Sequence, residues 1–220
     1  MKVKYALIPA TLAVGFGAYV AFHPGVAYAE PLIVSQGKAM EIKDTANYSI
    51  DPMHTSIYFE IPHMGLANVH GRINKFTGKV STSGADLSKA SVEFSAEARS
   101  IDTGVTPRDT HLKSADFFAV EKYPAITFKS TKISKSRNGY TAEGDLTIKA
   151  VTKKVSIPFK FYGPLKGSGE QPDKIGVIAE PIKINRRDFG VNYGNNLPDG
   201  TPAIGNEVTI RIALEAAKAK

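Results

Sequence analysis

The sequence contains no cysteine, and this absence excludes several kinds of chemistry at once. A thiol nucleophile, a cysteine-ligated zinc ion, a covalently attached c-type haem and a disulfide bond all require that residue. The chain also lacks the G-x-S-x-G, H-E-x-x-H and P-loop patterns of hydrolases, metalloproteases and nucleotide-binding proteins. We therefore expect neither an enzyme nor a resident cofactor.

Basic tracts with interleaved aromatic residues are also absent, so the sequence predicts no binding to nucleic acid. The formal net charge of +7 is modest for 220 residues. Such a charge suits an anionic ligand or lipid surface, and it equally suits a solvated surface that keeps the protein soluble. No internal repeat divides the chain, and its length favours a single domain.

Residues 1–29 have the pattern of a secretory signal peptide. Lys2 and Lys4 form a positive n-region, an apolar run follows over residues 5–22, and Ala27-Tyr28-Ala29 supplies a small-x-small cleavage site. We expect cleavage after Ala29 and a periplasmic mature protein. The apolar run is close to the minimum length of a membrane span, so an uncleaved anchor is the alternative.

The rest of the chain is predicted to be a flexible lead-in over residues 30–46 and a β-domain over residues 47–217. The domain shows period-two alternation of apolar and polar residues, which is typical of half-buried strands. The regular runs are residues 57–61, 92–98, 126–128, 146–148, 155–161 and 208–214. Less regular runs at residues 69–80 and 175–184 bring the total to about eight strands.

Three local signals refine this expectation. Asn138-Gly139 predicts a hairpin turn, and the spacing of Ile73 and Phe76 predicts a bulge because the two cannot share a face under strict alternation. Thr106-Pro107-Arg108-Asp109 reads as a capping box that starts a short helix ending at Lys113. The pattern therefore predicts an all-β fold, an eight-stranded antiparallel β-barrel with one short helix, in which closure removes the exposed sheet edges.

The inward-facing positions of this barrel are almost all apolar and rich in phenylalanine. An eight-stranded barrel either fills its interior with side chains or holds one small ligand, and the pattern leaves both open. The inward residues that we predict to line a pore are Ile57, Phe59, Ile61, Phe94, Ala96, Phe128, Leu146, Ile157, Phe159, Phe161, Ile210 and Ile212.

Several motifs in order resemble the YceI-like family of exported polyisoprenoid-binding proteins. They begin with YSIDPMHTSIYFEIPHMGLANVHGRINKFTG and SIDTG, and continue with RDTHLKSADFFAVEKYPAITFKST, GDLTIKAVTKKVSIPF and INRRDFGV. The similarity covers about residues 47–216. It implies a lipocalin-like eight-stranded barrel whose apolar pore takes an isoprenoid or other long lipid tail.

The histidines and the INRRDFGV motif carry the alternatives. His54, His63 and His70 are spaced too widely for a tight metal motif, so we expect structural hydrogen bonds and no metal, although a metal-binding or enzymatic barrel stays the rival hypothesis. Arg186 either binds a phosphate head group at the pore mouth or pairs with Asp188 or Asp109. Phe117 and Phe118 after the short helix either pack in the core or touch the ligand.

The hypothesis that follows is non-enzymatic binding, transport or sequestration of an isoprenoid lipid, such as a polyprenyl phosphate or a quinone tail, in the periplasm. A packed barrel that acts as an adaptor is a further alternative, which a continuous internal cavity would contradict. The partners left open besides the lipid are a membrane surface, contacted transiently, and a second copy in a homodimer.

We predict that the mature protein begins at Glu30 and fractionates with soluble periplasmic contents, because Ala27-Tyr28-Ala29 meets the small-x-small rule. N-terminal sequencing of protein from its own cells checks this. Recovery of Met1 in a membrane fraction would identify residues 1–29 as an anchor instead.

Overall fold

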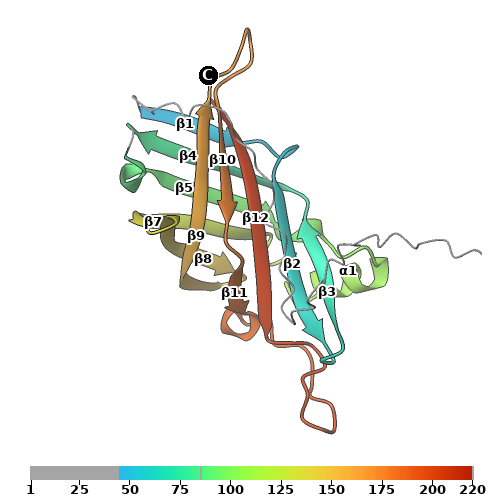
Figure 1. The fold of residues 1–220 in the computed structure, drawn as a ribbon. Helices are drawn as coiled ribbons and strands as arrows, with labels where there is room; N and C mark the ends of the chain where they lie inside the picture. Colours follow the sequence, from blue (N-terminus) through green and yellow to red (C-terminus); the bar gives the residue numbers. More distant parts are fainter. Residues whose placement is uncertain (1–44, 85, 220) are drawn as a thin grey trace, which may run out of the picture. The chain divides into compact units, whose positions relative to one another are not determined.

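Twelve β-strands form one antiparallel sheet in the computed structural model, which describes residues 45–84 and 86–219 (Figure 1). The strands are β1 (Thr45–Ile50), β2 (Ser56–His63), β3 (Ala67–Ile73), β4 (Phe76–Ser83), β5 (Ser91–Glu97), β6 (Ile101–Asp102), β7 (Ala125–Ser136), β8 (Gly139–Ile148), β9 (Val151–Leu165), β10 (Lys174–Ala179), β11 (Ile182–Asn185) and β12 (Glu207–Lys218). The helical elements are α1 (Thr106–Lys113) and three short 3₁₀ turns, η1 (Leu87–Lys89), η2 (Ala98–Ser100) and η3 (Arg186–Phe189).

The sheet closes on itself through β12. One edge of β12 pairs with β2 over residues 209–213 and with β1 over residues 216–218. The other edge of β12 pairs with β10 and β11. The remaining order runs β1-β4-β5-β7-β8-β9-β10. Eight strand positions make up the barrel. Four of them are each occupied by two consecutive short strands, namely β1/β2, β3/β4, β5/β6 and β10/β11. The predicted eight-stranded antiparallel barrel is therefore confirmed, with half of its strands broken in two.

The predicted start of the domain is slightly too late. Strand β1 begins at Thr45, two residues before the predicted start at position 47, and Ala46 is already buried in the core. The physical reason is that Thr45 and Ala46 pair with Ser83 and Thr82 of β4. The predicted signal peptide and the rest of the predicted lead-in lie outside the described residues.

A strand break is found where a bulge was predicted, and the predicted hairpin is present. Asn74 and Lys75 separate β3 from β4, and Ser100 accepts from Asn74 N through its carbonyl and from Lys75 N through its hydroxyl. This interruption lets Ile73 and Phe76 pack in the same apolar cluster, as the parity of the sequence required. Residues 137–138 form the two-residue turn between β7 and β8, with Ser136 paired to Gly139.

The predicted capping box is wrong, although the helix spans the predicted residues. Val105 is the N-cap and makes no side-chain cap bond, and Thr106 is the exposed first residue of α1. The Asp109 carboxylate instead accepts hydrogen bonds from Thr103 N at 2.9 Å and Thr103 Oγ1 at 2.5 Å. The left-handed turn at Gly104 (φ 77°) places Thr103 beside the first turn of the helix. In the described part of the chain, no helix reaches the length and apolarity needed to cross a bilayer.

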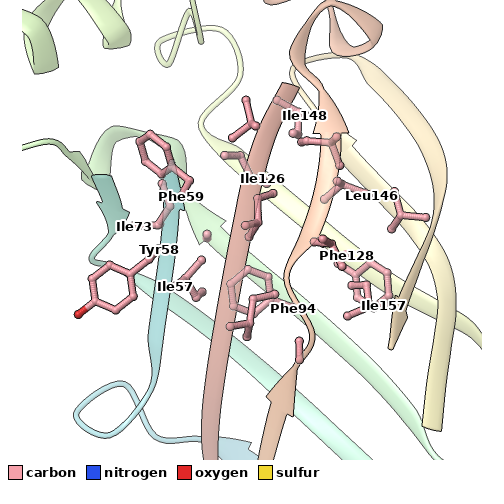
Figure 2. Close-up of a pocket in the computed structure, with 18 of the residues that line it drawn as sticks. Ile57, Tyr58, Phe59, Ile73, Phe94, Ile126, Phe128, Leu146, Ile148 and Ile157 are labelled. Atoms are coloured by element: carbon pink, nitrogen blue, oxygen red, sulfur yellow. The ribbon is translucent and has the colours of Figure 1, made fainter. Parts of the chain in front are cut away.

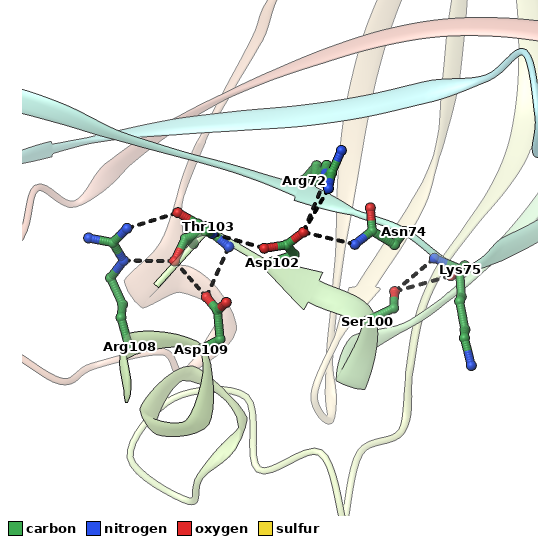
Figure 3. Close-up of polar contacts among 9 residues, drawn as sticks. Arg72, Asn74, Lys75, Ser100, Asp102, Thr103, Arg108 and Asp109 are labelled. Atoms are coloured by element: carbon green, nitrogen blue, oxygen red, sulfur yellow. Dashed lines mark hydrogen bonds and ion pairs between the residues drawn. The ribbon is translucent and has the colours of Figure 1, made fainter. Parts of the chain in front are cut away.

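A polar junction joins α1 to the edge of β3 (Figure 3). The Asp102 carboxylate accepts from Gly104 N at 2.9 Å, from Asn74 Nδ2 at 3.1 Å and from Arg72 Nη2 at 3.0 Å. Arg108 of α1 donates to the Thr103 hydroxyl at 2.7 Å. These contacts hold the pKa of Asp102 at about 2, chiefly through the Gly104 amide and then through Asn74 and Arg72. The junction thus fixes where the helix lies against the barrel.

We predict that acid weakens this junction in a defined window. Because the folded-state pKa of Asp102 lies below its usual value of 3.8, its stabilising contribution is complete above that pH and is lost as the pH falls through about 2. Asp102→Asn should remove this part of the acid sensitivity of the free energy of unfolding, measured by urea titration at several pH values. NMR titration should show the pKa rising in Asn74→Ala; a wild-type value near 3.8 would contradict the prediction.

Candidate functional site

The barrel encloses a cavity of about 420 Å³ (Figure 2). This volume lies within the range of about 300–1,000 Å³ that is usual for small-molecule sites. Figure 2 shows Ile57, Phe94 and Phe128 turned toward the interior from different strands; Tyr58, which also lines the cavity, is half exposed. The barrel is therefore hollow, which contradicts the packed-barrel alternative.

All the side chains predicted to face inward lie on the cavity wall. They come from β2, β5, β7, β8, β9 and β12 and are Ile57, Phe59, Ile61, Phe94, Ala96, Phe128, Leu146, Ile157, Phe159, Phe161, Ile210 and Ile212. Strand alternation explains this outcome, because one parity of each strand faces the interior. Their contact with a ligand stays a prediction.

Part of the wall was not predicted from the sequence. Ile182 and Ile184 line the cavity from β11, which follows the break after β10. Their alternation was visible in the sequence, but the strand is only four residues long. Val191 and Ile204 line the cavity from irregular segments after η3, where no periodic signal exists.

The aromatic residues after α1 form one end of the cavity. Phe117 and Phe118 both line it, and Phe117 is buried in a cluster with Ile148, Phe189 and Val191. Phe117 therefore packs in the core and also lines the cavity, while its contact with a ligand stays a prediction. Phe118 packs at the margin of the same cluster.

The same end carries most of the polar groups of the wall, whereas Thr55 lines the cavity from the turn before β2. Thr103, Arg108, His111 and Arg186 all line the cavity there. Among the described residues on the wall, none is an aspartate, a glutamate, a lysine or a serine. The charged groups that face the interior are therefore arginines, with no carboxylate beside them on the wall.

Arg186 is 5% exposed and is held by main-chain carbonyls. Its Nη1 donates to Val191 O at 2.6 Å, its Nε to Gly205 O at 2.8 Å and its Nη2 to Ile204 O at 3.2 Å. The predicted ion pairs with Asp188 or Asp109 are wrong, because the guanidinium turns inward to the loop that precedes β12. Burial and then the neighbouring Arg187 lower the pKa of Arg186. A buried guanidinium neutralised only by carbonyl dipoles favours an anion nearby.

An aromatic group lies at the rim beside α1. The His111 ring contacts Phe117 and Tyr193 edge-to-face, with centroid separations of 4.9 and 4.7 Å. His111 Nε2 lies 2.8 Å from Asp116 Oδ2. Tyr193 is on the cavity wall yet 45% exposed, so the wall meets solvent at this point.

The other histidines are dispersed over the molecule. His54 Nδ1 lies 2.7 Å from Asp51 Oδ2 in the turn before β2, which confirms the predicted local hydrogen bond. His70 Nδ1 lies 3.7 Å from Glu60 Oε2, an ion-pair distance, and His63 makes no side-chain hydrogen bond within the described residues. The structural hydrogen bonds predicted for His63 and His70 are therefore not formed.

Asp51, His54 and Glu215 are the one trio in the described ranges whose ligand atoms lie close enough, within 4.8 Å, to hold a metal ion. The Lys174 ammonium already lies 2.5 Å from Glu215 Oε1. That ion pair raises the pKa of Lys174, whereas the His54 hydrogen bond lowers the pKa of Asp51. The trio is therefore satisfied as a network of ion pairs and hydrogen bonds.

Comparison with known proteins agrees with this architecture. A UPF0312 protein of Vibrio cholerae is 36% identical over 154 residues, covering 67% of this chain and 79% of its own. The YceI protein of Campylobacter jejuni superposes with a TM-score of 0.58 at 26% identity, covering 72% of this chain and 90% of its own. A polyisoprenoid-binding domain from Saccharophagus degradans has the same fold, with a TM-score of 0.54 at 13% identity over 78% of this chain and 98% of its own. The YceI-like domain model matches residues 48–216, so the chain belongs to the YceI-like family.

Proposed function

We propose that the protein binds an isoprenoid lipid in the barrel cavity and carries or sequesters it in the periplasm without catalysis. The observation that carries the proposal is the continuous apolar cavity of about 420 Å³. The Saccharophagus degradans domain, which is described as polyisoprenoid-binding, shares the fold and supports the same assignment.

Apolar burial supplies the driving force for such binding. Each methylene removed from water contributes about 0.8 kcal/mol, so two or three isoprene units give several kcal/mol before ordering costs. The wall offers apolar side chains over most of its extent and no carboxylate or serine among its described residues. These groups suit a long hydrocarbon tail far better than they suit acid–base or nucleophilic chemistry.

The arginines of the wall indicate where a head group would lie. Arg108 Nε donates to Thr103 Oγ1 at 2.7 Å and its Nη2 to Thr103 O at 3.0 Å, which fixes a half-buried guanidinium at the α1 end. With Arg186 on the same wall, this end is positive and without an acidic partner on the wall. It therefore favours a phosphate head group over a neutral quinone ring.

We predict that Ala96→Phe removes lipid from the barrel while the thermal midpoint of the ligand-free protein stays near that of wild type. Ala96 lines the cavity and also belongs to a buried apolar cluster with Phe76 and Val80, so the new ring finds free volume only on the cavity side. Ser95→Phe is the matched control, because Ser95 is the exposed neighbour on the same strand. Native mass spectrometry of protein purified from its own periplasm measures lipid occupancy.

The result can contradict the proposal in two ways. Wild-type protein that never co-purifies with lipid, together with an Ala96→Phe variant destabilised by about 1–3 kcal/mol, would indicate an overpacked core. Phe161→Asp gives an independent check, because an unpaired carboxylate on the apolar wall should weaken lipid binding by several kcal/mol.

We further predict that Arg108→Gln weakens binding of a polyprenyl phosphate by about tenfold relative to a quinone with the same tail, because a charge-assisted hydrogen bond is lost. Competition between the two lipids for the wild-type and variant proteins measures this ratio. Arg99→Gln is the control, since Arg99 lies on η2 and pairs with Glu121 on the surface. Equal losses for both lipids would place the head group elsewhere.

A further inference from the structure

Two segments distant in the sequence form one end of the molecule. Residues 61–71 contain the β2–β3 turn, and residues 189–206 contain the loop before β12; together we name them the hairpin tip. Met64 N donates to Ala203 O at 3.0 Å, and Gly205 N donates to Pro62 O at 2.8 Å, so the two segments lie side by side. Figure 1 shows the turn and the loop projecting at the same end of β2 and β12.

The hairpin tip contains few charged residues of its own, although two cations from outside it contact its main chain. Arg187 Nη2 donates to Gly194 O at 3.1 Å, and Lys149 Nζ donates to Gly190 O at 3.0 Å. The chain has 28 Lys and Arg and 21 Asp and Glu among 220 residues, a charged fraction of 22%. At that fraction the 29 residues of the tip would include about six charges, yet Asp199 is the only one in their sequence. An exposed segment with so few charged residues of its own is unusual for a protein in water and typical of a segment that enters a less polar medium.

Two apolar side chains of the hairpin tip are exposed. Leu66 is 87% exposed at the turn, and Met64 beside it is also exposed. Met64 adopts a left-handed backbone (φ 55°), a strained conformation for a residue other than glycine. Two hydrogen bonds hold the turn in this form: Met64 N donates to Ala203 O, and Leu66 N donates to His63 O. The turn is therefore built to present Leu66 outward.

The hairpin tip is continuous with the opening of the cavity. Pro62, His63 and Tyr193 belong to the tip, line the cavity and are exposed. An isoprenoid tail that left a bilayer through water would lose about 0.8 kcal/mol for each exposed methylene. A mouth in contact with the bilayer avoids that exposure, and this argument selects a lipid surface over a protein partner.

We propose that the hairpin tip docks on the surface of a lipid bilayer by inserting Leu66, and that Tyr193 lies at the interface with the head groups. The docking supplies the route for cargo and so rests on the proposed function. Because Asp199 is the only charged residue within the tip and the inserting side chain is apolar, we expect binding to zwitterionic bilayers that responds little to salt, although Arg187 and Lys149 contact the main chain of the tip. The tyrosine suits this position, since one end of its ring is apolar and the other forms hydrogen bonds.

The chain has no tryptophan, so one introduced tryptophan reports on its own position. Leu66→Trp tests the tip, and Met53→Trp is the matched control. Met53 is 86% exposed in the turn before β2, at the opposite end of that eight-residue strand. With a rise of about 3.3 Å per residue, the two turns lie roughly 26 Å apart. Both proteins are mixed with phosphatidylcholine vesicles at low and high salt.

We expect the emission of Leu66→Trp to shift to shorter wavelength with vesicles at both salt concentrations, and that of Met53→Trp to stay unchanged. Leu66→Asp should lower the vesicle partition coefficient of the protein by about tenfold or more. An unchanged emission from Leu66→Trp, or an equal shift in both variants, overturns the proposal. A shift without vesicles that grows with protein concentration also overturns it, because the tip would then bind a second copy.

Cargo binding is measured separately, with a polyprenyl phosphate presented in detergent. Leu66→Asp protein that binds this lipid as wild type does, but no longer partitions onto vesicles, supports docking as a property of the tip alone. Wild-type protein that partitions onto vesicles yet binds no lipid in detergent would refute the proposed function and leave the docking intact. Lipid binding in detergent without any vesicle partitioning would refute the docking and leave the proposed function intact.

Discussion

Strand β12 closes the barrel, and the cavity depends on that closure. Its two edges pair with β1 and β2 on one side and with β10 and β11 on the other. The hydrogen bonds of these ladders satisfy backbone groups that would otherwise be free at two sheet edges. Once the ring is closed, one parity of every strand must face the interior, and the apolar side chains at that parity exclude water from it.

Four of the eight barrel strands that surround the cavity are broken in two. Interruptions at Asn74-Lys75 and at Glu180-Pro181 let the chain change direction within a single course around the ring. Proline at position 181 lacks the N–H that a continuous strand would need. The broken courses carry wall residues such as Ile73 and Ile182, which line the cavity.

The two ends of the barrel differ in chemistry, and this difference gives the cavity a direction. Near α1, Arg108 and Arg186 face the interior without a carboxylate on the described wall. The opposite end of β12 holds Asp51, His54, Lys174 and Glu215 in a network that is internally balanced. A ligand with an apolar tail and an anionic head would therefore be bound in one orientation. The hairpin tip, with exposed Leu66, lies at the mouth, where such a ligand would pass.

The sequence by itself determined the fold class and the part of the apolar wall that regular strands supply. Alternation at positions such as Phe94, Phe128 and Phe159 reports which side of a strand is buried, and that information is local to each strand. The resemblance to the YceI-like family was equally visible, since it depends on motifs in order along the chain.

Tertiary structure alone decided whether the interior is filled, what holds Arg186 and which segments meet at the mouth. The volume of the cavity depends on how broken strands curve around one another, which no local pattern encodes. The carbonyls that hold Arg186 include Gly205 O, 19 positions away in the chain. Sequence reasoning favoured a carboxylate partner because opposite charges attract, whereas the fold placed main-chain oxygens closer. The hairpin tip likewise exists only because residues 61–71 and 189–206 become neighbours when the barrel closes.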